Sequence, residues 1–374
     1  MVDWLPDRLE PHPTIVWEKK LASPGLGGVA ATDQSVIVSD RDLADSADIF
    51  RCLDAADGHE LWAVRYPARG KLDYGNSPRA TPLIDSDLVF LLGALGDLHA
   101  VSLASGQIVW NKNLRRDFGP VKLQAWGWCS SPLIADGRLI VNPGAKDASL
   151  VALDRATGQV FWKTPGAPAA FGSFILAQLA GRQELVGHDQ NSLGGWDPAT
   201  GKRLWQVAPA RTGDFNVPTP VQVADTLLVS TENNGTRAFR FDALGQIDRR
   251  PLAENVDLCP DAHTPIVIGN RLFGVSGELY CLDLSAGLKA LWTASDDAFS
   301  EYTSLLGSPE RVLITTLHGE LLLIDAQSPE YRLIDRSQLF ADDSGVYAHP
   351  ALVGTRLYVR GSNSICCVEL ALQQ

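Results

Sequence analysis

The chain is patterned as a succession of short hydrophobic runs separated by polar turns. In one stretch the runs cover Thr81–Ile84, Leu88–Leu92, Leu98–Leu103 and Gln107–Asn113, with Asp, Gly or Ser between them. Short runs that alternate between apolar and polar residues, or are wholly apolar, predict β-strands, and the turn residues between them predict hairpins. This stretch therefore predicts a four-stranded antiparallel sheet.

The stretch recurs along the chain, and a motif marks each copy. The motif has an aliphatic, a small and an aliphatic residue, then Asp, a short variable segment, Gly, and Trp four positions after the Gly. Four copies keep this spacing and end in Trp62, Trp110, Trp162 and Trp205, and a fifth ends in Trp292 with one extra residue. A period of 40 to 50 residues with four strands is typical of propeller blades.

Three further copies complete the count. Two of them, around Asp242 and Asp325, lack the Trp, and the last is split between the chain ends, with Cys367-Val368-Glu369 at one end and a Trp17-bearing strand at the other. The sequence thus predicts an all-β, eight-bladed β-propeller that forms a single domain over residues 1–374. Residues 14–20 form the closing strand of the last blade, and residues 25–370 supply the remaining strands.

Each residue of the motif has a structural reason. Asp accepts hydrogen bonds from the amides that follow it, and Gly takes a positive φ at the end of the turn, so the pair predicts a hairpin between the third and fourth strands. A Trp on the fourth strand can stack on the neighbouring blade. The phase of the repeat also predicts two strands within 174–186, where helix propensity alone favours a helix.

The copies ALDRATGQVFW (Ala152–Trp162) and GWDPATGKRLW (Gly195–Trp205) resemble the tryptophan-docking repeat of the pyrroloquinoline-quinone-like β-propeller family. In size, the chain resembles the stand-alone propellers of that family, typified by the lipoprotein of the outer-membrane β-barrel assembly machine. This resemblance implies a protein of the periplasm or outer envelope, although Met1–Glu10 does not have the pattern of an export signal.

The charge of the chain argues against nucleic acid binding, and its hydropathy argues against a membrane-spanning helix. The formal net charge of −12 opposes binding to nucleic acid, which requires a basic face. No apolar run reaches the roughly 18 residues that a membrane-spanning helix needs, so no transmembrane segment is predicted. We expect a monomer that binds a protein partner.

In a propeller, the loops that lead into the innermost strands share one face with the loops between the second and third strands, and this loop face surrounds the central channel. Five of the leading loops place a hydroxyl residue or His before Pro, which satisfies backbone groups and fixes the strand start. Six residues near these loops depart from the repeat and are candidates for ligand or partner binding: Arg79, Trp128, Asn216, His263, Tyr302 and His349.

The clearest case of an unusually long loop is Asn113–Trp128, between the second and third blades. It carries Arg115 and Arg116, and we expect it to expose Phe118, Trp126 and Trp128, a composition enriched in protein interfaces. An alternative is that these aromatic rings fold back and plug the channel mouth.

Charges are expected to be unevenly distributed over the loop face. The early blades place basic residues there and the later blades place acidic ones, which predicts a bipolar rim that orients a charged partner. The basic set is Arg65, Arg69, Lys71, Arg115, Arg116 and Lys122, and the acidic set is Glu254, Asp257, Asp261, Asp296, Asp297, Glu301, Asp342 and Asp343.

The sequence supports no cofactor or metal. The adjacent Cys366 and Cys367 resemble the vicinal pair of quinoprotein dehydrogenases, but Cys367 occupies the small-residue position of the repeat, which favours packing over a disulfide. The motif acids are turn formers, and the His residues lack metal-ligand spacing. The preferred function is a non-enzymatic protein-binding scaffold; the alternatives are a quinone- or metal-dependent oxidoreductase and a carbohydrate-binding propeller.

Overall fold

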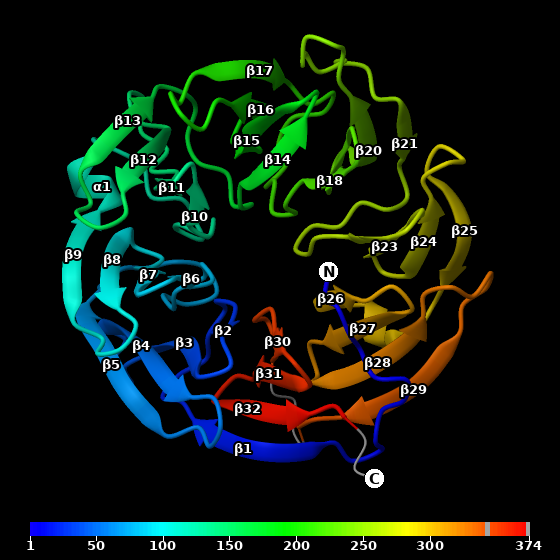
Figure 1. The fold of residues 1–374 in the computed structure, drawn as a ribbon, viewed down its shortest axis with the longest axis horizontal. Coiled ribbons are helices and arrows are strands. Elements are labelled where there is room, and N and C mark those ends of the chain that lie inside the picture. Colours follow the sequence, from blue (N-terminus) through cyan, green and yellow to red (C-terminus); the bar gives the residue numbers. More distant parts are fainter. Residues whose placement is uncertain (341–344, 372–374) are drawn as a thin grey trace. The chain divides into compact units, whose positions relative to one another are not determined.

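The computed structural model describes residues 1–340 and 345–371. Within these residues, 32 strands form eight antiparallel sheets of four strands each, arranged as the blades of a β-propeller (Figure 1). The prediction of an all-β, eight-bladed propeller is confirmed. By its internal contacts the chain divides into two compact units: unit 1 contains Met1–Gly70, Asn76–Ile84 and the described residues from Pro265 onward, and unit 2 contains Lys71–Gly75 and Asp85–Thr264. The single domain predicted for residues 1–374 stays a prediction.

Four sheets belong to unit 1. The first blade consists of β2 (Ala30–Ala31), β3 (Ser35–Arg41), β4 (Ala47–Asp54) and β5 (Glu60–Pro67). The sixth consists of β22 (Ile266–Ile268), β23 (Arg271–Val275), β24 (Leu279–Asp283) and β25 (Lys289–Ala294), and the seventh of β26 (Thr303–Gly307), β27 (Arg311–Thr316), β28 (Glu320–Asp325) and β29 (Leu333–Gln338). The eighth and last consists of β30 (Ala351–Val353), β31 (Arg356–Arg360), β32 (Ser364–Glu369) and β1 (Thr14–Lys20).

The other four sheets lie mainly in unit 2. The second blade consists of β6 (Leu83–Asp85), β7 (Leu88–Leu92), β8 (Asp97–Ser102) and β9 (Ile108–Asn113), and the third of β10 (Leu133–Ala135), β11 (Arg138–Val141), β12 (Leu150–Asp154) and β13 (Val160–Thr164). The fourth consists of β14 (Ile175–Leu179), β15 (Arg182–Asp189), β16 (Ser192–Trp196) and β17 (Arg203–Val207). The fifth consists of β18 (Val221–Val223), β19 (Thr226–Thr231), β20 (Gly235–Arg240) and β21 (Ala253–Asn255).

The N-terminal strand closes the last blade, as the split repeat predicts. Strand β1 covers Thr14–Lys20 and pairs antiparallel with β32, so that Trp17 lies opposite Cys367 (Figure 1). The indole Nε1 of Trp17 donates to the carbonyl of Ala55 at 3.0 Å, in the turn of the first blade. Pairing the two ends of the chain in this way gives the last blade its fourth strand, with β1 at the outer edge, and ties both ends of the chain into one sheet.

The repeated small residue and the repeated Trp are partners across two strands. Ala100 pairs with Trp110, Ala152 with Trp162, and Gly195 with Trp205. A small side chain on the third strand leaves room for the indole, which then reaches the turn of the next blade. The Nε1 of Trp110 donates to Arg155 O at 2.9 Å and that of Trp162 to Pro198 O at 3.0 Å.

The motif acids form the turns themselves. The Oδ1 of Asp154 accepts from Thr157 N and from Thr157 Oγ1, both at 2.8 Å, and these hydrogen bonds lower the pKa of Asp154. Asp197 accepts from the amides of Ala199 and Thr200 in the same way. These carboxylates are occupied by the backbone of their own hairpins, as the sequence predicts.

The segment 174–186 contains two strands, as the repeat phase predicts. Strand β14 ends at Leu179, and β15 begins at Arg182 after a turn in which Ala180 and Gly181 have positive φ. Ala177 and Val186 belong to a buried cluster shared with Leu227 and Phe239 of the next blade. Packing between blades therefore overrides local helix propensity here.

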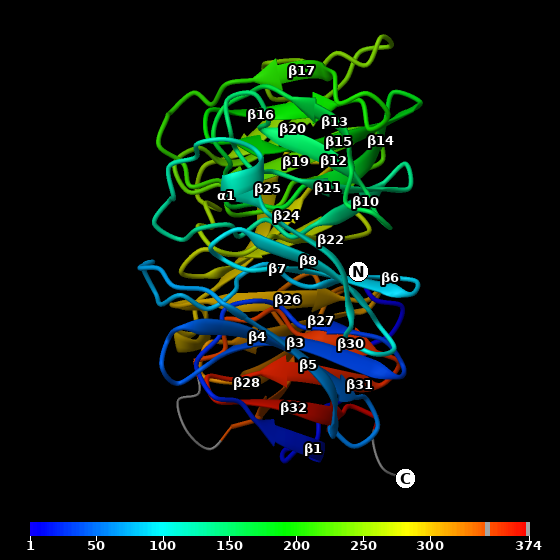
Figure 2. The same cartoon turned by 90° about the vertical axis from the view of Figure 1, so that its left-hand side faces the viewer.

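Helical structure is confined to loops in the described residues. Figure 2 labels β6, β7 and β8 together with α1 (Leu114–Asp117), a single turn that follows β9 and is capped by the Asn113 side chain. The element η1 (Asp297–Phe299) is a 3-10 turn after β25. Neither element, nor any other helix among the described residues, has the length and hydropathy needed to cross a membrane.

Candidate functional site

Four aromatic residues from four successive inter-blade loops meet in unit 2. The ring centroid of Trp126 lies 4.6 Å from that of Phe171, 4.8 Å from that of Phe215 and 6.3 Å from that of Tyr74. We refer to Tyr74, Trp126, Phe171 and Phe215 as the aromatic cluster. Tyr74 is 75% exposed and Phe215 50% exposed, whereas Phe171 is buried. The cluster therefore presents apolar ring surface to solvent.

Backbone hydrogen bonds join the loops that carry these rings. The amide of Asp73 donates to Ala125 O at 2.9 Å, beside Tyr74 and Trp126. Gly172 N donates to Asn216 O at 2.7 Å, which joins the loop of Phe171 to the loop of Phe215. The loops of Trp126 and Phe171 are linked in turn by a hydrogen bond from Gln124 Nε2 to Ala169 O.

A turn of the fifth blade holds the last of these loops. The amide of Phe215 donates to the carboxylate of Glu232, and Asp214 Oδ1 accepts from Asn233 N at 2.8 Å. Burial raises the pKa of Glu232, and the charges of Asp214 and Asp261 act in the same direction. Tyr74 and Asn216 have positive φ values of 62° and 54°, which are uncommon for residues other than Gly. The surrounding loops thus hold Tyr74, at one end of the cluster, in a strained backbone conformation, whereas Asn adopts this region more readily than other residues.

The predicted candidates in the long loop after β9 have different outcomes. Trp126 is half-buried and lies at the centre of the cluster. The prediction that Trp128 is exposed is wrong: its side chain is 4% exposed, and its Nε1 donates to Pro143 O at 3.3 Å. Its ring packs against Gly96, where an added Cβ would come within 2.9 Å of it. Because Gly96 has no side chain, the Trp128 ring fits against it and is buried in the loop before β10.

The arginine candidates lie apart from the cluster contacts. Arg115 and Arg116 are exposed on α1, and Arg116 pairs with Asp117 at 2.8 Å. Arg79 is half-buried and donates to Ser77 O at 2.8 Å. Two acids of the proposed bipolar rim, Asp342 and Asp343, lie outside the described residues, and the rim stays a prediction.

The remaining candidates lie near the starts of inner strands. In unit 1, the Tyr302 ring lies 5.9 Å from that of Tyr347, and the exposed His349 has its Nδ1 3.0 Å from Pro350 O. In unit 2, His263 and Asn216 are both buried. Of the sequence-predicted candidates, Trp126 belongs to the aromatic cluster and Asn216 directly follows its member Phe215.

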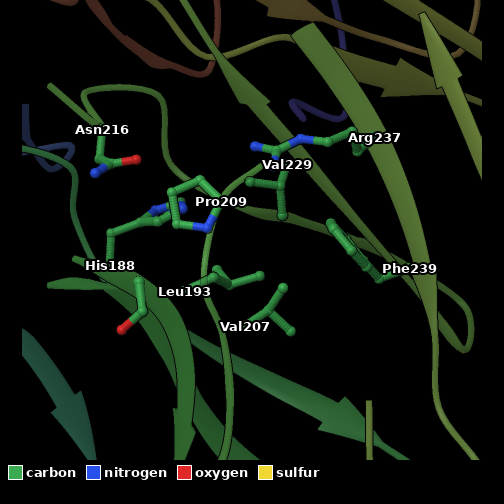
Figure 3. Close-up of a pocket in the computed structure, with 9 residues that line it drawn as sticks. His188, Leu193, Val207, Pro209, Asn216, Val229, Arg237 and Phe239 are labelled. Atoms are coloured by element: carbon green, nitrogen blue, oxygen red, sulfur yellow. The ribbon is translucent and has the colours of Figure 1, made fainter. Parts of the chain in front are cut away.

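Asn216 also lines a small pocket between the fourth and fifth blades (Figure 3). The pocket is lined by His188, Ser192, Leu193, Val207, Pro209, Asn216, Val229, Arg237 and Phe239. Figure 3 shows the Arg237 guanidinium extending from β20 toward the side of the pocket where Asn216, Pro209 and His188 lie. We call this the Arg237 pocket. Burial and the nearby charge of Arg237 lower the pKa of His188 to about 3.

The other chemically interesting groups have structural surroundings. All six cysteines are free thiols; Cys366 and Cys367 are buried in β32, where burial raises their pKa values to about 12 and about 11. Among the described residues, Asp54, Asp57 and His59 bring ligand atoms within 4.8 Å of one another. Asp54 accepts from Ala56 N, and Asp57 contacts His59, so this group is an exposed motif turn.

Sequence reasoning missed three members of the aromatic cluster. Tyr74, Phe171 and Phe215 each lie in the loop before the first strand of the next blade, between 4 and 9 residues ahead of it, as Trp126 does. An aromatic residue in this loop of successive repeats is a signal that could have identified them. His188 and Arg237 lie within regular strands and carry no comparable signal.

Comparisons with known proteins agree with the architecture. The profile of a protein family described as outer membrane protein assembly factor BamB matches residues 13–125 and 121–294. A protein named outer membrane protein assembly factor BamB from Shewanella oneidensis is 25% identical, over 78% of this chain and 85% of its own length. A protein of the same name from Yersinia pestis is also 25% identical, over 47% of this chain and 41% of its own length.

Solved structures share the fold at low sequence identity. BamB from Moraxella catarrhalis aligns with a TM-score of 0.66 at 15% identity, covering 96% of this chain and 99% of its own. Quinohemoprotein alcohol dehydrogenase from Comamonas testosteroni aligns with a TM-score of 0.67 at 14% identity, covering 97% of this chain and 77% of its own. At these identities the structural likeness establishes the fold alone.

Proposed function

The chain belongs to the family of the outer membrane protein assembly factor BamB, and from this membership we propose that it is a non-enzymatic protein-binding scaffold of the bacterial cell envelope. The partner is a protein that takes part in outer membrane protein assembly, and it binds at the aromatic cluster. The observation that carries this proposal is the contact of Tyr74, Trp126, Phe171 and Phe215 across four loops.

The composition of the cluster supports a binding role. Large aromatic side chains dominate the energetic centres of protein interfaces because they bury much apolar area for few rotatable bonds. Tyr74 and Phe215 leave at least half of their side-chain surface in water. A partner that covers these rings gains the hydrophobic free energy that the isolated chain forgoes.

The rigidity of the cluster also supports a binding role. Its loops are joined by hydrogen bonds, through Asp73 and Ala125, through Gln124 and Ala169, and through Gly172 and Asn216. Loops held in one conformation before binding lose less conformational entropy when a partner arrives. The cluster therefore has the properties of a preorganised contact surface.

A complementation experiment tests the proposal. In a host strain that lacks the gene, we expect wild-type protein to restore the amounts of outer membrane proteins. The double variant Trp126→Ser/Phe215→Ser should fail to do so, because each lost aromatic contact weakens binding by about 2 kcal/mol or more. Phe161→Ser is the matched control, since Phe161 is 59% exposed on β13, in the same unit but outside the cluster.

Two outcomes of this experiment would contradict the proposal. If the double variant is present at wild-type amounts, keeps the wild-type circular dichroism spectrum and restores the outer membrane proteins, the cluster is not the docking site. If wild-type protein itself has no effect on outer membrane protein amounts, the role in assembly is wrong. Cell fractionation and light scattering test the proposed envelope location and monomeric state.

A further inference from the structure

The Arg237 pocket holds a buried guanidinium that lies 5.8 Å from the centre of the Phe239 ring but forms no ion pair with a described carboxylate. Arg237 is 9% exposed, and its Nη2 donates to Thr231 Oγ1 at 3.1 Å. Its Nε has no hydrogen-bond partner, and in the described part of the chain no carboxylate forms an ion pair with it. An unpaired buried charge costs several kcal/mol of folding free energy.

The nearest acidic residues, Asp214 and Glu254, do not neutralise the charge of the Arg237 guanidinium. The charges of Asp214 and Glu254 favour the protonated guanidinium, but burial dominates and lowers the pKa of Arg237. Asp214 is engaged by the neighbouring turn, since its Oδ1 accepts from Asn233 N and its Oδ2 from Asn234 Nδ2. Glu254 lies opposite Arg237 in the backbone register of β20 and β21, but its side chain is exposed and forms no ion pair with the guanidinium among the described residues.

Two further polar groups line the same pocket. The Nδ1 of His188 has no hydrogen-bond partner, although the side chain is only 4% exposed. With its pKa lowered to about 3, the imidazole is neutral at pH 7 and carries one N–H. Asn216 Nδ2 makes a long hydrogen bond of 3.4 Å to Asp214 O. The pocket thus combines one cation with neutral N–H donors.

The rest of the lining is apolar except for Ser192, whose hydroxyl is already bonded to Asp189 and Arg203. Leu193, Val207, Pro209, Val229 and Phe239 surround the polar groups. Such walls exclude water, which strengthens an interaction between the guanidinium and an anion. In this conformation the space holds about one water molecule, so a carboxylate enters only as the lining side chains move apart, and the ligand must be compact.

From this arrangement we propose that the Arg237 pocket binds a single carboxylate group, with Arg237 as its charge partner and His188 and Asn216 as hydrogen-bond donors. The carboxylate comes either from a small free acid or from the tip of an acidic side chain of the bound protein. The second source rests on the proposed function, because Asn216 follows Phe215 of the aromatic cluster. The first source does not depend on it.

Thermal unfolding with acetate tests the site. At constant ionic strength, balanced with chloride, which carries no carboxylate, we expect acetate at ten times its Kd to raise the Tm by about 2 °C. Arg237→Gln should weaken acetate binding at least ten-fold, because a charge-assisted hydrogen bond is lost. Arg240→Gln is the matched control, since Arg240 lies on the same strand with its side chain 62% exposed.

A direct measurement on the wild-type protein guards against misfolding of the variant. With 13C-labelled histidine, acetate should shift the His188 side-chain resonance and leave the resonance of the exposed His59 unchanged. A Tm rise of equal size in Arg237→Gln, or no shift of the His188 resonance, would overturn the proposal.

The source of the carboxylate is resolved by a second ligand. Aspartate blocked by an acetyl group at its amine and an N-methylamide at its carboxyl end carries the side-chain carboxylate between two peptide groups. Binding of both acetate and blocked aspartate supports a protein-borne carboxylate, and binding of acetate alone supports a small free acid. Because no partner is present in these titrations, their outcome is independent of whether the aromatic cluster docks a protein.

Discussion

Docking of each Trp onto a motif glycine can be measured by adding one methyl group. Gly158 closes the turn after β12 with φ +70°, and a Cβ there would lie 2.8 Å from both Cδ2 and Cε3 of Trp110. Gly137 closes another turn of the same blade with φ +71°, and an added Cβ there would have no atom within 4 Å. The two Gly→Ala variants share the backbone cost and differ in the contact with Trp110.

The magnitudes follow from these two contributions. Alanine in the left-handed region costs about 1–2 kcal/mol, so we expect Gly137→Ala to lower the free energy of unfolding by roughly that amount. In Gly158→Ala the indole must also move, which adds about 1–3 kcal/mol of overpacking. Movement of the ring also weakens its hydrogen bond to Arg155 O, worth about 1 kcal/mol. The expected excess over Gly137→Ala is about 2–4 kcal/mol.

Urea unfolding followed by circular dichroism measures both variants. A second comparison in a Trp110→Ala background isolates the contact, because the excess should vanish when the ring is absent. Equal destabilisation by Gly137→Ala and Gly158→Ala in the wild-type background would refute the reasoning that the glycine is required for Trp docking.

Three further predictions concern buried polar groups. Trp205→Phe should cost about 1.5–3 kcal/mol more than Trp292→Phe in urea unfolding, because Trp205 Nε1 donates to the buried carboxylate of Glu184 at 2.5 Å whereas Trp292 Nε1 has no partner among the described residues. Arg360→Met should lower the free energy of unfolding by about 3 kcal/mol or more, since the fully buried guanidinium donates to backbone carbonyls that include Ser23 O at 2.9 Å and Gly361 O at 2.9 Å; a loss below 1 kcal/mol would contradict this. Folding lowers the pKa of His188 from its ordinary 6.5 to about 3. The contribution of neutral His188 to the free energy of unfolding is therefore fully present above pH 6.5 and is lost as the pH falls toward 3. Between pH 7 and pH 5 the wild-type protein should therefore lose about 2 kcal/mol more stability than His188→Asn, as measured by urea unfolding at the two pH values.

The repeat made most of the fold predictable. The Asp, Gly and Trp of each copy act within one blade and the next, so their spacing alone indicates the hairpins, the docking and the closure by residues 14–20. The strands in 174–186 followed from the phase of the repeat, against local propensity. The sequence shows that a small residue recurs at the same position of each repeat, but not why. The strand pairing gives the reason, because this residue lies opposite the Trp, as Gly195 lies opposite Trp205.

The site was less predictable, for a physical reason. The members of the aromatic cluster come from four loops, and no local pattern records that their rings meet. The error at Trp128 has the same origin, since its burial depends on the missing side chain of Gly96 in another blade. Arg237 and His188 look like ordinary strand residues in sequence. Only the packing of the fourth blade against the fifth places them around one pocket.

Site-specific photo-cross-linking tests the docking role of the aromatic cluster most directly. A photoreactive phenylalanine analogue at position 215 in the native host should give one discrete cross-link to a protein of the outer membrane assembly apparatus, identified by mass spectrometry. The same analogue at position 161, which is also exposed but lies on β13, should give none to that protein. Identical cross-linking patterns at both positions, or no protein cross-link at position 215, would contradict the account.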